Sequence, residues 1–303
     1  MEIRQLEALI GIAEHGSFSG AAAGLGTVQS NISGRIAKLE DELGTELVDR
    51  STGLLTEAGV VTAERARVIL REMAAIASDV AEITSEVRGV VSIGMIGTAG
   101  RWIVPMLLDA QRSRFPHVAL RIKEGTNSAL EPQVVSGHLD IAVLAFPVSA
   151  PELSDRPLFA EDLLLVVEKD HPLATTTSPL TLSEVSKHEI FLPMTGTPIR
   201  REIDDACTKA GVTLASLIEV DGVRTIASMV FDGHGPAILP ATMLTPRLRT
   251  AFVGLPIADL SPRHVVVANR RFGFPTAPVR AINELLSSVV REAPHTPDGV
   301  YVE

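Results

Sequence analysis

Apolar side chains recur at helical spacing in three short segments of the first 60 residues, with breaks at Gly16 and Gly26. This pattern predicts three helices, of which the second begins after Ser17, a good N-cap residue, and the third runs from about Val28 to Leu43. Tight turns between short helices are typical of a helix-turn-helix domain. The side chains expected to face inward are Leu6, Leu9, Ile12, Ala13, Phe18, Ala21, Ala22, Leu25, Val28, Ile32, Ile36, Leu39 and Leu43.

The third predicted helix has small polar and basic side chains on its outer face. Gln and Asn match the edges of adenine, Ser and Thr bind phosphates, and Arg binds guanine or phosphate. We therefore expect this helix to enter the DNA major groove. The side chains available for this role are Thr27, Gln29, Ser30, Asn31, Ser33, Arg35 and Lys38.

After Gly44, residues 46–56 are predicted to form two short strands around a turn, a small wing with Arg50 as its single cation. Residues 1–56 contain four basic and eight acidic side chains, a net charge of −4, whereas residues 27–38 contain two basic ones and none that is acidic. One copy should therefore bind DNA weakly and need a second. A three-helix core with a merely solvated outer face remains the alternative.

A long helix is predicted from residues 56–59 to about Arg88. Its apolar positions recur at alternating steps of three and four, which indicates a coiled-coil seam between two chains. An amphipathic helix packed on its own domain is the alternative. The seam positions are Ala66, Ile69, Met73, Ile76, Val80, Ile83 and Val87.

Residues 1–60 resemble the winged helix-turn-helix of LysR-type transcriptional regulators. Three features depart from the family pattern: Val48 replaces an aromatic residue, Gly20 and Gly34 stand where basic residues are common, and the wing is short. The resemblance implies DNA contacts by Ser17, Phe18 and Arg50, assembly into dimers and tetramers, and RNA polymerase as a partner. The matching positions are Leu6, Ser17-Phe18, Ala21-Ala22, Leu25, Gln29, Ser33, Ile36, Leu39-Glu40, Leu43-Gly44, Leu47, Arg50 and Leu55-Thr56-Glu57-Ala58-Gly59.

From Gly89 onward, predicted strands alternate with predicted helices, which indicates βαβ units and an α/β fold. A second set of elements begins after Pro157, and a last strand and helix return to the first set. This order resembles the two-lobed effector domain of the same family, which is similar to type 2 periplasmic binding proteins. The tail from Pro294 is expected to be loose. The expected parts are the DNA-binding domain (1–58), the linker and dimerisation helix (59–88) and the effector domain (89–303), with lobe I at about 89–158 and 266–293 and lobe II at about 159–265.

Loops at the ends of these strands are rich in hydroxyl, amide and glycine residues, where α/β folds bind ligands. Backbone N–H groups and threonines can hold a carboxylate there, and Arg101 or Arg224 can neutralise it. Helix capping by the hydroxyls and solvated salt bridges by the arginines are the alternatives. The expected effector-binding residues are Thr98, Gly100, Arg101, Thr126, Asn127, Ser128, Phe146, Thr195, Thr197 and Arg224.

Composition limits the remaining possibilities. A hydrophobic content of 46% excludes a disordered chain, and the net charge of −10 argues against bulk binding to nucleic acid. No secretory signal or membrane-spanning run is visible, so we expect a cytoplasmic protein without membrane contact. Cys207 is the single cysteine, which excludes an intrachain disulfide. Its expected state is a buried, inert thiol.

The sequence shows no pattern that indicates a metal, a cofactor or catalysis. The eight histidines have no ligand spacing, and no nucleophile, P-loop or metalloprotease motif occurs. In the acidic pairs Glu161-Asp162 and Asp204-Asp205, the two side chains are neighbours in sequence and would diverge on a helix. Acid–base catalysis by such a pair is therefore not expected. We therefore predict a DNA-binding transcriptional regulator controlled by a small-molecule effector, and not an enzyme. The alternatives are a ligand sensor whose N-terminal domain mediates protein contacts, and an α/β enzyme with an appended helical domain.

Overall fold

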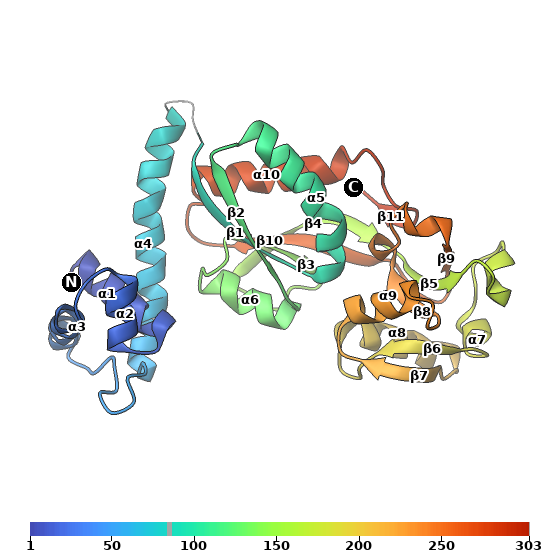
Figure 1. The fold of residues 1–303 in the computed structure, drawn as a ribbon, viewed down its shortest axis with the longest axis horizontal. Coiled ribbons are helices and arrows are strands. Elements are labelled where there is room, and N and C mark those ends of the chain that lie inside the picture. Colours follow the sequence, from blue (N-terminus) through green and yellow to red (C-terminus); the bar gives the residue numbers. More distant parts are fainter. Residues whose placement is uncertain (84–86, 303) are drawn as a thin grey trace.

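The computed structural model describes residues 1–83 and 87–302. A helical head, a long helix and a two-lobed α/β domain follow one another along the molecule (Figure 1). The long helix, α4, stands between the head and the first lobe.

The head is a three-helix core completed by the first turns of α4. The Ser17 side chain caps α2 as predicted, because its Oγ accepts a hydrogen bond from Gly20 N at 3.0 Å. Leu9, Ile32 and Ile36 are fully buried in this core. The helices are α1 (Ile3–His15), α2 (Phe18–Gly24), α3 (Gln29–Leu43) and α4 (Glu57–Ile83).

Three side chains that the pattern placed inward are exposed, and all three lie at helix ends. Val28 is the N-cap of α3, Leu43 is its last residue and Leu25 is the C-cap of α2. Their exposed fractions are 60%, 42% and 40%. The apolar stripe of a helix faces the core only within its regular turns, so the helical period places its end residues poorly.

The predicted pair of wing strands is shorter than expected. The wing forms a single bridge between Val48 and Leu55, around a turn in which Gly53 has a φ of 74°. Its base packs tightly on the start of α4. A Cβ on Gly59 would lie 1.9 Å from the carbonyl oxygen of Leu47, so only glycine fits this contact.

Helix α4 has 27 residues and is therefore about 40 Å long. The predicted extension to Arg88 does not hold at residues 87–88, which are not helical; residues 84–86 lie outside the described part of the chain. Of the predicted seam, Ala66 is buried in the head core, and Val87 packs against lobe I. The side chains of Val80 and Ile83 lie outside the described residues. The seam positions left exposed along the helix are Ile69, Met73 and Ile76.

Lobe I contains a six-stranded sheet in the order β11-β4-β10-β3-β1-β2. Strands β1, β2 and β3 are parallel to one another, whereas β10 runs antiparallel to both of its neighbours. Helices α5 and α10 cover one face and α6 covers the other (Figure 1). The elements are β1 (Gly89–Met95), α5 (Gly97–Arg114), β2 (Val118–Glu124), α6 (Asn127–Val135), β3 (Ile141–Ala145), β4 (Leu153–Glu161), β10 (Arg263–Arg270), α10 (Ala277–Arg291) and β11 (Val300–Tyr301).

Lobe II contains a five-stranded sheet in the order β7-β6-β8-β5-β9. Helices α7 and α8 pack on one face through the core around Leu165 and Ile203, and α9 packs on the other. The elements are β5 (Leu163–Glu168), η1 (Pro172–Thr175), α7 (Leu182–Val185), β6 (Glu189–Pro193), α8 (Pro198–Ala210), β7 (Ala215–Val220), α9 (Val223–Phe231), β8 (Ala237–Pro240), η2 (Ala241–Met243), η3 (Leu248–Thr250) and β9 (Phe252–Pro256).

The chain crosses between the lobes twice, and both crossings differ slightly from the expected boundaries. Strand β4 remains in the first sheet through Glu161, and β10 joins that sheet from Arg263 onward. The sequence pattern did not predict β4, because Asp155, Arg156 and Pro157 interrupt the alternation of apolar and polar residues.

The prediction of a loose tail is also wrong for residues 300 and 301. Val300 is buried, and β11 pairs antiparallel with β4. The Tyr301 hydroxyl donates to Asp162 Oδ2 at 2.9 Å, and Asp298 pairs with Arg249 of lobe II at 2.8 Å. Contacts to both lobes fix this segment across the crossing.

Candidate DNA-binding and effector sites

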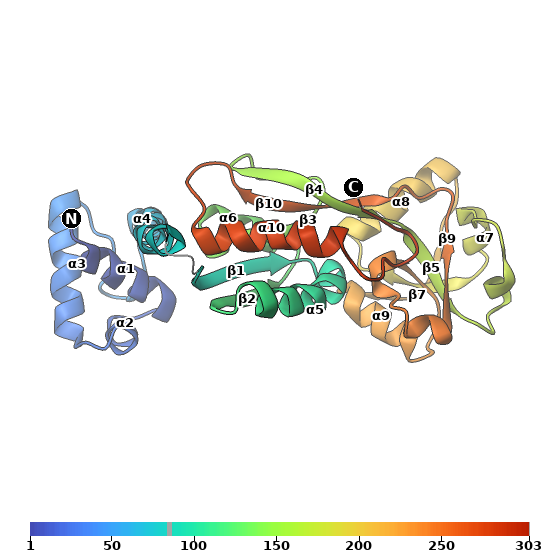
Figure 2. The ribbon, with the colours of Figure 1, turned by 90° about the horizontal axis from the view of Figure 1, so that it is seen from above.

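The predicted recognition helix α3 forms the outer edge of the head, on the side opposite the α/β domain (Figure 2). Gln29, Ser30, Asn31 and Lys38 are exposed on it, and Thr27 precedes its first turn. Two hydrogen bonds hold the amide side chains in place: Asn31 Nδ2 donates to Thr27 Oγ1 at 2.9 Å, and Ser19 Oγ donates to Gln29 Oε1 at 3.0 Å. The polar face of α3 is thus ordered before any ligand binds.

The remaining predicted contacts on α3 are Ser33 and Arg35, which are half-buried. Within the described residues, Arg35 and Lys38 form no ion pair. A cation without a carboxylate partner is available to a phosphate. Among the described residues, no carboxylate therefore neutralises the two basic side chains of the recognition segment.

Arg50 of the wing has two partners inside the head. Its Nη2 lies 2.7 Å from Glu40 Oε2 at the end of α3, and its guanidinium lies over the Phe18 ring at 5.4 Å. Glu40 also accepts hydrogen bonds from the backbone N–H groups of Leu47 and Val48. Burial raises the pKa of Glu40, but these bonds and Arg50 outweigh it, so that pKa is lowered. The contact fixes the wing to α3, a structural role that the sequence pattern did not indicate.

A cavity of about 1440 Å³ lies between the two lobes and extends to α4. Asn127, Ser128 and Phe146 of the expected effector residues line it. One face of α8 forms the opposite wall with Arg201, Glu202 and Asp205. The other lining residues are Val61, Glu64, Arg65, Val68, Glu72, Glu131, Pro132, Val135, Ser136, Ala145, Pro147, Ser149, Ala150, Glu152, Gly196, Pro198, Arg270, Phe272 and Gly273.

The other seven expected effector residues do not line this cavity. Thr126 Oγ1 lies 3.0 Å from Ser128 Oγ, Thr195 donates to Glu219 and Thr197 donates to the carbonyl oxygen of Met194. The hydroxyls of Thr126 and Thr197 therefore have partners within their own loops, and that of Thr195 has a partner on β7. Gly100 lies in the first turn of α5, where its N–H donates to the Ile96 carbonyl oxygen.

The two arginines expected to neutralise a carboxylate lie elsewhere. Arg224 forms an ion pair with Glu124, and the Arg101 guanidinium lies over the Phe231 ring at 5.7 Å. Both contacts join lobe I to α9 of lobe II. They favour the solvated or structural alternative for these two side chains.

Thr98 belongs to a buried network of hydrogen bonds and one ion pair, which the sequence did not predict. Its Oγ1 accepts a hydrogen bond from Arg263 Nη2 at 2.6 Å, and Arg263 also pairs with Glu161 at 2.6 Å. Glu161 is completely buried and accepts further bonds from Thr242 of lobe II. Glu161 and Arg263 carry opposite charges at the two places where the chain changes lobe, but the sequence alone does not pair them.

Glu202 of the cavity wall interacts electrostatically with both charges of this network, Arg263 and Glu161. Burial raises the pKa of the Glu202 carboxyl, Arg263 lowers it and Glu161 raises it, and the net shift is upward. The cavity thus contains a carboxyl group that is protonated more readily than a solvated one.

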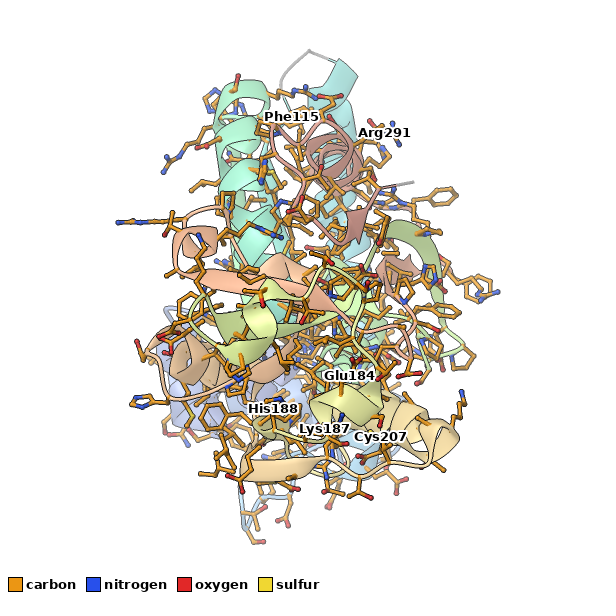
Figure 3. The ribbon with its side chains drawn as sticks, turned by 90° about the vertical axis from the view of Figure 1, so that its right-hand side faces the viewer. Phe115, Glu184, Lys187, His188, Cys207 and Arg291 are labelled. Carbon is orange, nitrogen blue, oxygen red and sulfur yellow. The ribbon has the colours of Figure 1, made fainter. Side chains whose placement is uncertain are left out.

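Cys207 lies on α8 in the core of lobe II, beside α7 with its labelled Glu184 (Figure 3). Burial, followed by the charge of Asp204, raises the pKa of its thiol. A thiol with a raised pKa is a poor nucleophile at neutral pH. This position agrees with the expected buried, inert cysteine.

No group of three or more His, Cys, Asp or Glu side chains in the described part of the chain is arranged to hold a metal ion. None of the helices in residues 1–83 and 87–302 is both long and apolar enough to cross a membrane.

Comparison with known sequences decides between the remaining interpretations of the fold. A sequence profile described as "Bacterial regulatory helix-turn-helix protein, lysR family" matches residues 3–60, and one described as "LysR substrate binding domain" matches residues 84–291. The chain belongs to the LysR family. It is therefore a LysR-family DNA-binding transcriptional regulator with an effector-binding domain.

Individual LysR-family proteins match almost the whole chain. The Escherichia coli K12 protein described as "DNA-binding transcriptional dual regulator OxyR" is 31% identical over 294 residues, which cover 96% of this chain and 95% of that protein. A full-length OxyR variant from Pseudomonas aeruginosa has a TM-score of 0.72 at 24% identity, over 96% of this chain and 95% of that one. Full-length CbnR complexed with its target DNA has a TM-score of 0.66 at 23% identity, over 96% and 99%. These two structures confirm the predicted LysR-type fold.

Proposed function

We propose that the chain binds promoter DNA as a dimer and that a small molecule in the inter-lobe cavity controls this binding. The ordered polar face at the start of α3 is the observation that carries the proposal. Gln29 and Asn31 are exposed there, on the outer edge of the head, and the recognition segment has a local charge of +2. The structure of CbnR with its target DNA supports this role by analogy.

The polar side chains of the head that we expect at the DNA have separate proposed roles. Gln29 and Asn31 read base edges, because amide side chains match the donor and acceptor pattern of adenine. The other side chains bind the sugar-phosphate backbone, which fixes the register of the helix. These backbone contacts are Ser17, Thr27, Ser30, Ser33, Arg35 and Lys38, with Phe18 and Arg50 supporting the wing.

An exposed apolar stripe on α4 supports self-association of the chain. Ile69, Met73 and Ile76 lie on one face of the helix at steps of four and three, and are 40%, 41% and 65% exposed in the single chain. Burying such a stripe against a second α4 removes apolar surface from water and supplies a second recognition helix. We extend the proposal to tetramers, to contact with RNA polymerase and to a cytoplasmic location, since promoters lie there.

The charges that line the cavity indicate the class of effector. Six acidic and three arginine side chains line it, and Arg101 and Arg224 are engaged elsewhere. This charge disfavours the carboxylate suggested by the loop chemistry. We propose an uncharged or cationic organic molecule, with Phe146, which is 54% exposed, as its aromatic contact.

The cavity also suggests how the signal is transmitted. Its walls come from both lobes and from α4, through Val61, Val68 and Glu72. A ligand that binds one arrangement of these walls better than another shifts the population toward that arrangement. Because α4 leads directly into the head, such a shift changes the spacing of two paired recognition helices.

Several relatives are described as hydrogen peroxide-inducible genes activators. Peroxide oxidises accessible thiolates, which then form disulfides with a second thiol. This chain has one cysteine, buried in lobe II and with a raised pKa. We therefore propose that its effector response does not use an intrachain thiol–disulfide switch.

Gel-shift assays at several salt concentrations, with DNA from the genomic neighbourhood of the gene, test the proposal. We expect a specific shift that Gln29→Ala and Arg35→Ala weaken in vitro and in vivo. The proposal fails if no fragment is shifted and neither substitution has an effect in vivo. That result would favour a sensor whose head contacts proteins, whereas turnover of a ligand would favour an enzyme.

A further inference from the structure

The loop between β10 and α10, residues 271–275, carries the two most exposed large apolar side chains in the described part of the chain. Phe272 is 78% exposed and Phe274 is 83% exposed. Exposed aromatic residues are frequent anchors of protein interfaces. We call these five residues the aromatic loop.

The aromatic loop is held in place although its tip is solvated. The backbone N–H of Arg271 donates to the Glu152 carbonyl oxygen at 2.8 Å, and its Nη2 donates to the Leu153 carbonyl oxygen at 3.1 Å. At the other end, Arg280 Nη1 donates to the Pro275 carbonyl oxygen at 2.6 Å. A loop ordered in advance loses little conformational entropy when it binds.

The aromatic loop lies beside α4. A Cβ on Gly273 would be 3.4 Å from Glu72 Oε1, which places the tip against the middle of that helix. Phe272 and Glu72 also line the same cavity. The next residue, Met73, belongs to the exposed stripe of Ile69 and Ile76. A second helix seated on that stripe would therefore pass next to the two phenylalanines.

The charges of the two segments are complementary. Residues 270–275 contain two arginines, Arg270 and Arg271, and no acidic residue, whereas residues 70–83 contain three acidic residues and one arginine, Arg71. Arg270 and Arg271 donate to backbone carbonyl oxygens, which satisfy their N–H groups without neutralising their charge. The C-terminal half of α4 is thus suited to the aromatic loop in both charge and hydrophobicity.

We propose that the aromatic loop docks on α4 of a second copy of this chain and extends the α4 seam onto the effector domain. This inference rests on the proposed α4 dimer. It gives each effector domain a contact with the linker helix of its partner, so that movement of lobe I acts on both heads. Phe272 and Phe274 are the anchors, and the surrounding arginines orient the acidic half of the helix.

Cross-linking between differently tagged chains tests the contact, and Cys207→Ala supplies a cysteine-free background. Chains with Phe274→Cys and chains with Ile76→Cys are mixed and treated with a short bismaleimide. We expect a cross-linked heterodimer, together with Ile76→Cys homodimers that report the α4 seam. Met194→Cys, an exposed apolar position of lobe II, replaces Phe274→Cys as the control and should give no heterodimer.

Seam cross-links without the Phe274–Ile76 product would overturn the docking while leaving the α4 dimer intact. If neither product forms, the dimer and the docking both fail.

Sedimentation equilibrium provides a second measurement. We expect Phe272→Ser with Phe274→Ser to weaken self-association about tenfold or more, and Met194→Ser to leave it nearly unchanged. An unchanged association constant for the double variant would also contradict the docking.

Discussion

Arg263, the first residue of β10, donates to Glu161, the last residue of β4, with its Nε at 2.8 Å and its Nη2 at 2.6 Å from the same carboxylate oxygen. The pair joins the two strands along which the chain passes between the lobes. Thr98 of lobe I and Thr242 of lobe II complete its hydrogen bonds. The two lobes therefore share one buried ionic network at their junction.

Removal of one partner leaves a buried charge without compensation. We expect Arg263→Met to lower the free energy of unfolding of the effector domain by about 3–5 kcal/mol, measured by urea denaturation. Arg224→Ala is the control, because the exposed Arg224–Glu124 pair should contribute at most about 1 kcal/mol. A loss under about 1 kcal/mol for Arg263→Met would show that the network does not support the fold.

Glu202 makes stability depend on pH. Its folded pKa is raised by burial, so the fold favours the neutral carboxyl, and this contribution is present below the ordinary pKa and lost as pH rises through the raised one. At pH 7 we expect Glu202→Gln to stabilise the protein by a few tenths to about 1 kcal/mol. The gain should vanish near pH 4. An equal gain at both pH values would contradict the assignment.

Glu40 holds the wing on α3. Glu40→Ala removes the acceptor of the Leu47 and Val48 N–H groups and the ion pair with Arg50, so we expect a loss of about 1–3 kcal/mol in thermal or urea unfolding. Because the folded-state pKa of Glu40 is lowered, this stabilisation is fully present above the ordinary carboxyl pKa and is lost as pH falls through the lowered one. Asp41→Ala, an exposed neighbour on the same helix, should cost little. The role is refuted if both substitutions have the same effect.

Two substitutions on α3 separate base reading from backbone binding. Gln29→Ala should remove about 1–3 kcal/mol of discrimination at one base pair of the operator. Lys38→Ala should weaken binding to all sequences and reduce the slope of log K against log salt by about 1. Fluorescence anisotropy with operator variants at several salt concentrations measures both. Lys187→Ala in lobe II serves as the control, and identical profiles for the two α3 variants would contradict their assigned roles.

Cys207→Ala should leave the regulator functional. The buried thiol makes no disulfide, so we expect a stability loss of only about 1 kcal/mol and unchanged operator binding. Hydrogen peroxide should affect the native and substituted proteins equally in a promoter-reporter assay. A peroxide response that disappears in Cys207→Ala would show that the thiol senses the oxidant.

The sequence predicted the head well, because its side chains follow a helical period that maps directly onto burial. Ile32, Ile36 and Leu39 are all completely buried. The prediction failed at Val28 and Leu43, which lie at the ends of α3, where the period no longer determines the direction of a side chain. It also failed for β4, whose polar residues and Pro157 hide a strand that only its neighbours β10 and β11 stabilise.

The lining of the proposed effector cavity was predicted less well than the head, because loop composition does not show which side chains are engaged elsewhere. Loop composition identified Asn127, Ser128 and Phe146, which line the cavity, but it did not show that Arg101 and Arg224 have partners of their own. Partners distant in sequence determine whether a charged side chain is free. Glu161 and Arg263 are 102 residues apart, so no local pattern could pair them.

The place of β10 in lobe I determines when this protein can fold during synthesis. The strand lies between β3 and β4, yet the ribosome makes it only after all of lobe II. Until then β3 and β4 lack the neighbour that joins them, and each has an open edge. The head and lobe II can form as the chain emerges, but lobe I must wait for residues 263–270. A chain that ends early would therefore have a folded DNA-binding head and an aggregation-prone remainder, a combination that favours its rapid degradation.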